Sequence, residues 1–151
     1  MEFLTTDITV TATCRLGAID LTDDLRSHVK DSGVQNGLAV ASTGHTTCGL
    51  LLNEWETGFL DDLRARLDAL APVGAYYAHD DLTVRTENLV GPDEPRNGHA
   101  HVAHALLGAA NHSIPVRDGE LLLGQWQRLI FIELDEPRPR RVTLSVMGAG
   151  G

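Results

Sequence analysis

The sequence is poor in cysteine, aromatic residues and positive charge, and each shortage excludes a class of protein. Two cysteines, Cys14 and Cys48, among 151 residues are too few for the disulfide framework of a small secreted domain. Phe, Trp and Tyr make up only 5% of the chain, so the core must rest on Leu, Val, Ile and Ala. The formal net charge of −9 would repel nucleic-acid phosphates and anionic membranes, so we expect neither nucleic acid nor membrane as a partner.

Long apolar runs are missing as well. No segment approaches the roughly 20 consecutive apolar residues of a transmembrane helix. Residues 1–7 have neither the basic region nor the apolar region of a secretory signal. We therefore expect a cytoplasmic protein. An apolar share of 42% is ordinary for a globular chain, and the length fits one domain, which we expect to span residues 1–151.

Hydrophobic periodicity predicts strands and helices that are interspersed without a strict βαβ rhythm. Strands are expected at residues 8–14, 38–42, 49–52, 121–134 and 142–146. Helices are expected at residues 22–32, capped by Thr22 and ended by Gly33, at 57–70, ended by Pro72, and at 98–110, capped by Asn97. The fold class predicted is α+β, a single compact domain with a mixed β-sheet packed with helices.

The last two predicted strands carry a further expectation. Residues 129–132 are apolar at every position, which is typical of a strand covered on both faces, by helices or by another subunit. The strand at 142–146 is expected to pair with it across the turn at residues 135–137. Burial between subunits at residues 129–132 would fit a homo-oligomer.

Histidines are the residues that most invite a chemical reading. The chain has seven of them: His28, His45, His79, His99, His101, His104 and His112. Neutral imidazole is a common metal ligand, and three such groups with an open position suit a catalytic divalent metal. A lone histidine is nevertheless more often a surface or hydrogen-bonded residue, and none of these spacings is a zinc signature such as His-Glu-x-x-His.

Two other features allow both a functional and a structural interpretation. Arg138, Arg140 and Arg141 form the only concentrated basic cluster, and guanidinium groups suit phosphate oxygens. A solvated turn in an acidic protein explains the same cluster equally well. Cys48 follows His45 closely enough to suggest a nucleophile, but a small buried thiol is the more common role for such a residue.

Several motifs, in a fixed order, resemble those of the YjbQ family, to which the activity of a secondary thiamine-phosphate synthase has been assigned. The resemblance covers residues 3–147 and rests on five segments: the His-Thr-Thr run that starts at His45 and continues to Asn53-Glu54, Tyr77-Ala78-His79, Asn97 to His101, Gly119 to Gln127, and Glu133 to Arg140. The chain departs from the family pattern at Cys48, where Ala is usual, at Gln125, where Thr is usual, and at Asn111, where Ser is usual.

The resemblance selects site residues from the broader set. It implies a metal held by His45, His79 and His101, with zinc favoured and iron, nickel or magnesium as alternatives. Glu54 and His45 would be catalytic, and a small anionic substrate would contact Thr46, Thr47, Asn53, Trp126, Gln127, Arg138 and Arg140. The family likeness also implies a compact α+β fold that assembles as a homotrimer.

Three functions remain open at this stage. The first is a transferase that joins a pyrimidine diphosphate to a thiazole phosphate, in which a divalent metal and arginines stabilise the departing pyrophosphate. The second is a metal-dependent hydrolase, in which three histidines hold a metal that activates water and Glu54 is the general base. The third is a non-enzymatic metal-binding or ligand-binding protein whose fourth metal position is closed by Glu54 or Cys48.

Overall fold

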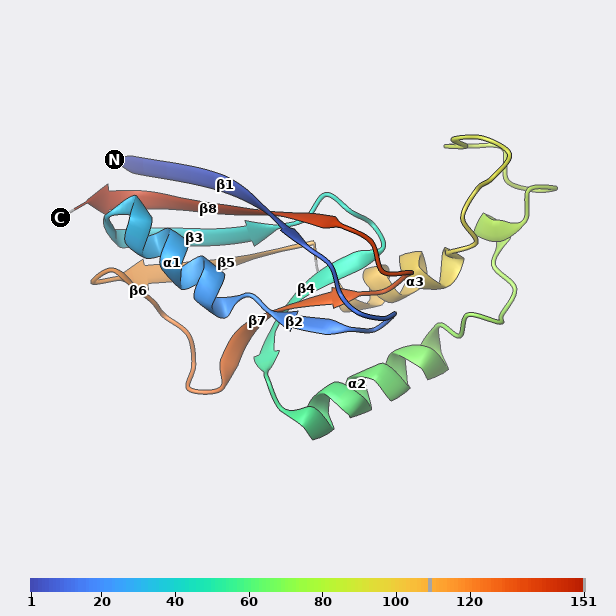
Figure 1. The fold of residues 1–151 in the computed structure, drawn as a ribbon, viewed down its shortest axis with the longest axis horizontal. Coiled ribbons are helices and arrows are strands. Elements are labelled where there is room, and N and C mark those ends of the chain that lie inside the picture. Colours follow the sequence, from blue (N-terminus) through green and yellow to red (C-terminus); the bar gives the residue numbers. More distant parts are fainter. Residues whose placement is uncertain (109, 151) are drawn as a thin grey trace.

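The computed structural model describes residues 1–108 and 110–150. Within them, eight strands form two sheets, and three α-helices and one 3-10 helix pack around the sheets (Figure 1). The strands are β1 (Glu2–Val10), β2 (Ala18–Asp20), β3 (Val34–Ser42), β4 (Cys48–Glu54), β5 (Asn111–Arg117), β6 (Glu120–Leu121), β7 (Gln127–Glu133) and β8 (Arg140–Gly150). The helices are α1 (Thr22–Ser32), α2 (Thr57–Leu70), η1 (Ala78–Asp80) and α3 (Gly98–Leu107). The predicted α+β class is confirmed.

The strands form a five-stranded sheet in the order β1-β8-β3-β5-β6 and a three-stranded sheet in the order β2-β7-β4. Every pairing within the described residues is antiparallel, so two antiparallel sheets replace the single mixed sheet that the sequence predicted. Strands β1 and β8 run side by side, which brings both ends of the described chain to the same end of the molecule (Figure 1).

Strand β7 separates two apolar cores. Leu129 and Phe131 belong to a large core that α1 shares with both sheets, whereas Ile132 and Leu134 belong to a smaller core under α2 and α3. The prediction that this strand is covered on both faces is confirmed. The cover comes from the chain itself, so the burial of residues 129–132 needs no second subunit.

The predicted pairing of residues 142–146 with the preceding strand is wrong. Strand β8 leaves the turn after β7 and joins the other sheet, between β1 and β3. There Val142, Leu144 and Val146 point into the large core. Alternation showed correctly which residues face inward, but alternation carries no information about which strand is the neighbour.

Helix boundaries show how well local signals worked. Helix α2 spans the predicted residues, and Gly33 ends α1 in the left-handed conformation, with φ of 69°. Thr22 does not cap α1: Asp20 accepts a hydrogen bond from the Thr22 backbone N–H at 2.9 Å, and the buried Thr22 hydroxyl accepts one from the Leu129 N–H. The first strand spans Glu2–Val10 rather than residues 8–14.

None of the described helices is both long enough and apolar enough to cross a membrane.

Candidate functional site

The candidate site is a cavity of about 890 Å³ at the end of the molecule where η1, the N-terminus of α3 and the long loop between them meet. Three residues predicted from the sequence line it, namely Thr46, His79 and His101. Arg85 and Glu94, from the loop, line the same cavity. Its volume lies within the range of small-molecule sites in proteins.

His79 and His101 face each other in this cavity. Their ring centroids lie 4.4 Å apart, and the ring planes are tilted by 40°. The Asp80 carboxylate contacts His79 Nδ1 at 3.0 Å, and within the described part of the chain Nε2 of that ring makes no hydrogen bond. Burial, helped by the positive fields of His79 and Arg85, lowers the pKa of His101 and so favours the neutral imidazole that can bind a metal.

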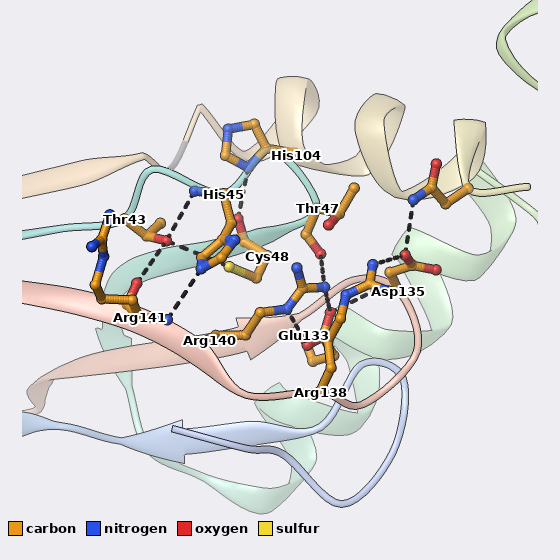
Figure 2. Close-up of polar contacts among 11 residues, drawn as sticks. Thr43, His45, Thr47, Cys48, His104, Glu133, Asp135, Arg138, Arg140 and Arg141 are labelled. Carbon is orange, nitrogen blue, oxygen red and sulfur yellow. Dashed lines mark hydrogen bonds and ion pairs between the residues drawn. The ribbon is translucent and has the colours of Figure 1, made fainter. Parts of the chain in front are cut away.

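His45 does not join this pair in the structure. It lies in the loop between β3 and β4, where its Nε2 accepts a hydrogen bond from the backbone N–H of Arg141 at 3.1 Å (Figure 2). Burial and the nearby charges of Arg140 and Arg141 lower the pKa of His45. Across residues 1–108 and 110–150, no group of three or more His, Cys, Asp or Glu side chains is arranged to hold a metal ion. Two of the three predicted metal ligands therefore come together, and binding through His45 Nε2 would require the Arg141 hydrogen bond to break.

Each arginine of the cluster lies beside a carboxylate, and Figure 2 shows two of these pairs, Arg140 with Glu133 and Arg138 with Asp135. Arg140 is buried, with its side chain 3% exposed, and it makes two bonds to the fully buried Glu133, at 2.7 Å from Nε and 2.5 Å from Nη2. Burial lowers the pKa of Arg140, but the hydrogen bond and negative charge of Glu133, together with the charges of Cys48 and Asp135, raise this pKa above its ordinary value. The Nε and Nη2 donors of Arg140 are bonded to Glu133 and to the Thr47 carbonyl, so a contact between this buried side chain and substrate stays a prediction.

The other two arginines are more accessible. Arg138 forms an ion pair with Asp135 and keeps 40% of its side chain exposed, and Arg141 lies 3.8 Å from Asp7 with 70% exposed. Each positive charge of the cluster is thus matched by a negative one. A contact between Arg138 and substrate stays a prediction.

Four further predicted residues lie at the far end of β4. Glu54 and Gln127 are paired across β4 and β7, Asn53 is next to Glu54, and Trp126 is next to Gln127. At about 3.3 Å per residue, Glu54 lies roughly 20 Å along the strand from Cys48, near which His45 sits. Within one chain the structure therefore does not bring Glu54 to the histidines, where its predicted role as general base would require it to be.

Thr47 and Cys48 have structural environments. The Thr47 side chain is buried, and its backbone carbonyl accepts hydrogen bonds from the Leu134 N–H at 3.2 Å and from Arg140 at 3.4 Å. Cys48 is fully buried beside the Thr43 hydroxyl, and burial raises the pKa of its thiol. A buried thiol with a raised pKa is a poor nucleophile, which agrees with the structural interpretation of this residue.

Three of the remaining histidines bond to backbone carbonyls. His28 contacts the Leu4 carbonyl at 3.2 Å, His104 the Cys48 carbonyl at 2.7 Å and His112 the Leu50 carbonyl at 2.9 Å. The last two cover carbonyls on the edge of β4 that does not pair with β7. These rings hold the two sheets and α3 together, as expected for histidines outside a metal site.

Sequence reasoning missed the residues that shape the cavity loop. The Arg85 guanidinium donates to the backbone carbonyls of His79 at 3.1 Å, Glu87 at 3.1 Å and Asn88 at 2.9 Å, and it lies 3.4 Å from Glu94. It therefore ties the loop to η1. No local pattern marks such a role, because a single arginine in an irregular segment looks like any solvated surface charge.

Comparison with known proteins places these observations in a family. The family model described as "UPF0047 protein YjbQ-like" matches residues 6–149. A UPF0047 protein of Archaeoglobus fulgidus is 36% identical over 93% of this chain and 99% of its own length. One from Methanothermobacter thermautotrophicus is 32% identical over 98% of this chain and 94% of its own.

Solved structures agree with the sequence comparison. A YbjQ-like protein of unknown function from Sulfolobus solfataricus superposes with a TM-score of 0.84 at 30% identity and covers 97% of this chain and 98% of that one. A hypothetical protein from Aeropyrum pernix superposes with a TM-score of 0.83 at 32% identity, covering 97% and 99%. In sequence and in fold, from β1 to the end of β8, the chain belongs to the UPF0047 (YjbQ-like) family.

Proposed function

We propose that this protein is a metal-dependent enzyme acting on a small phosphorylated substrate, and that its active site is the cavity lined by His79, His101 and Thr46. The observation that carries the proposal is the pair of imidazoles that face each other 4.4 Å apart at the wall of a cavity of about 890 Å³. Two imidazoles that face each other suit zinc, and iron or nickel would accept the same donors. Magnesium prefers oxygen ligands and fits this site less well.

Charge also favours a metal. A chain with a net charge of −9 needs a local positive group to attract a phosphate. The arginines nearest the site are already engaged, Arg140 by Glu133, Arg138 by Asp135 and Arg85 by three carbonyls. A bound divalent metal would supply the positive charge that stabilises the negative oxygens of the substrate and its leaving group.

The substrate then bridges the histidines and the polar wall of the cavity. His79 and His101 hold the metal, and His45 is the third ligand if its Nε2 exchanges the Arg141 N–H for the metal. The Thr46 hydroxyl, at the cavity wall, is a hydrogen-bond donor for a phosphate oxygen. Of the two arginines predicted to contact substrate, Arg138 is the more accessible, with 40% of its side chain open to solvent against 3% for Arg140.

Among the reactions considered, the joining of a pyrimidine diphosphate to a thiazole phosphate remains the one that the family resemblance implies. The hydrolase alternative required Glu54 as general base, and Glu54 lies roughly 20 Å along β4 from the His45 end. The purely structural metal site required Glu54 or Cys48 as a closing ligand. Cys48 is fully buried against Thr43 instead, so an open metal position is the arrangement more consistent with these contacts.

We also propose a cytoplasmic homotrimer. The far end of β4 carries two exposed indoles, Trp55 and Trp126, with 43% and 65% of their surface open. They flank the paired residues Glu54 and Gln127. A head-to-tail contact in a closed ring would bury this end against a neighbouring subunit. Sedimentation should then give three times the chain mass, and a stable monomer at micromolar concentration would contradict the assembly.

The metal assignment is tested by metal content. After exposure to equimolar Zn²⁺ and desalting, the parent chain should retain about one ion per subunit, and His79→Ala and His101→Ala should each lose most of it. His28→Ala is the matched control, because that ring bonds to the Leu4 carbonyl far from the cavity. Equal metal content in parent and His101→Ala would overturn the assignment. Thiamine-phosphate formation from the two precursors, assayed beside a panel of phosphate esters, then identifies the reaction.

A further inference from the structure

A single oxygen atom of Asp80 connects His79 to the first turn of α3, the helix that carries His101. Its Oδ1 accepts one hydrogen bond from the backbone N–H of Gly98 at 2.9 Å and contacts His79 Nδ1 at 3.0 Å. The Asp80 side chain is 17% exposed, so solvent competes weakly for these bonds. An ionised carboxylate can only accept hydrogen bonds, and therefore Nδ1 of His79 must carry the proton. The other ring nitrogen, Nε2, is then the atom with a free lone pair.

The contact to Gly98 places Asp80 at the N-terminus of α3. Asn97 occupies the N-cap position but makes no capping bond with its side chain, which donates to Asp135 at 2.9 Å instead. Asp80, from a separate segment, satisfies one of the free N–H groups of the first turn and puts negative charge at the positive end of the helix dipole. His101 lies one turn further along the same helix. Asp80 thus fixes the position of η1, which carries His79, relative to the helix that carries His101.

Gly98 makes this close approach feasible. A Cβ atom at that position would lie 2.5 Å from Tyr77 Cβ, 2.8 Å from Tyr77 Cγ and 3.2 Å from Asp80 Oδ1. Any side chain would therefore push η1 away from the first turn of α3. Gly98, Asp80 and His79 thus form one contact that joins the first turn of α3, a carboxylate and an imidazole.

We propose that Asp80 is the positioning residue of the metal site: it sets the tautomer of His79 so that Nε2 is the ligating atom, and it fixes the separation of His79 from His101. The role in metal binding rests on the proposed function, whereas the tautomer of His79 is a property of the metal-free protein. Carboxylates that hold the second nitrogen of a ligating histidine orient the ring and increase its basicity.

The first test is the tautomer in the metal-free, full-length protein. Long-range ¹H–¹⁵N correlation spectra of histidine-labelled protein, recorded where the imidazoles are neutral, should show His79 with a protonated Nδ1 and an unprotonated Nε2. In Asp80→Ala the Nε2–H form, which histidine prefers in water, should become the major one. Asp80→Asn retains an acceptor oxygen and should keep most of the parent tautomer. A parent protein with His79 protonated at Nε2 would refute the proposal without any variant.

The second test is affinity for Zn²⁺, measured by competition with a chromophoric chelator. Asp80→Ala should weaken binding about 10- to 100-fold, with partial recovery in Asp80→Asn. Asp81→Ala is the matched control, because this neighbouring carboxylate bonds to Thr83 and Tyr76 and not to a histidine. Unchanged affinity and an unchanged tautomer in Asp80→Ala would overturn the positioning role. If the parent protein binds no Zn²⁺ but Asp80→Ala still changes the tautomer of His79, the proposed function is overturned and the role of Asp80 in setting the tautomer remains.

Discussion

Removing Arg140 should destabilise the protein severely, because it would leave a buried carboxylate without its partner. Glu133 is fully buried, and Arg140 is the only side chain among the described residues that forms an ion pair with it. Breaking a buried pair from one side costs about 3–5 kcal/mol. Domains of this size have a total free energy of unfolding of about 5–15 kcal/mol. Arg140→Met should therefore remove a large share of the stability, with a fall in melting temperature of about 6–20 °C.

The experiment is a double-mutant cycle measured by urea unfolding. Glu133→Gln removes the negative charge and keeps an oxygen that can accept the hydrogen bond now made by the Asp135 N–H at 3.1 Å. In this background Arg140→Met should cost at least about 2 kcal/mol less than it does in the parent, since no unpaired charge remains. Arg138→Met is the matched control: Arg138 is 40% exposed and its buried partner Asp135 keeps a hydrogen bond from Asn97, so this change should cost less stability than Arg140→Met.

Two results would refute this reasoning. One is a loss of stability in Arg140→Met that is no greater than in Arg138→Met. The other is the absence of any coupling to Glu133→Gln. Either result, combined with lost activity in a normally folded Arg140→Met protein, would restore Arg140 to the role of a substrate ligand that the sequence predicted.

Three further changes have outcomes fixed by local geometry. Among the described residues, neither buried ring nitrogen of His99 has a hydrogen-bond partner, so His99→Leu should increase the free energy of unfolding in urea by on the order of 1 kcal/mol; a decrease would contradict this. Burial alone would raise the pKa of Asp135, but hydrogen bonds and the Arg138 charge outweigh it and lower that pKa. The unfolded chain therefore binds the proton more readily, and the free energy of unfolding should fall as pH drops below about 4. Asp135→Asn should flatten that fall in acid titrations of unfolding. A Cβ at Gly37 would lie 2.0 Å from the Met147 carbonyl, so Gly37→Ala should cost about 2 kcal/mol or more by thermal unfolding, whereas Gly74→Ala, with nothing within 4 Å, should change stability by less than about 0.5 kcal/mol.

Local signals in the sequence predicted elements better than they predicted neighbours. Helix α2 was predicted to its ends because a helical apolar stripe and a terminating proline coincide. Strand β8 was predicted from its alternation, but its partners were not. Successive strands pair more often than not, and that tendency favoured a hairpin with β7. The chain instead carries β8 into the middle of the larger sheet, where its inward residues complete a core that residue spacing alone cannot reveal.

The candidate site shows the same limit for chemistry. Residue type singled out His79 and His101, and the fold brings them together. Asp80 and Arg85 were not found, because their roles depend on which loop atoms lie beside them after folding. The burial of charge was missed for the same reason. A run of arginines can be counted from the sequence, but the fold decides which carboxylates pair with them: Glu133 of β7, Asp135 of the turn and Asp7 of β1.

That difference changes where anion recognition should be sought. A count of charges along the chain points to the turn at residues 138–141, as the one basic cluster in a protein of net charge −9. In three dimensions each arginine of the turn has an acidic partner, and Arg140 is buried in an ion pair with Glu133. An anionic ligand near this turn would have to compete with carboxylates for every guanidinium. The histidine cavity has two imidazoles that face each other, and a divalent cation bound between them would add positive charge at the cavity wall. Binding of a phosphorylated substrate should therefore depend on prior metal binding, and substrate affinity measured with and without Zn²⁺ should differ by at least about tenfold. Equal affinity in both conditions would return the anion site to Arg138.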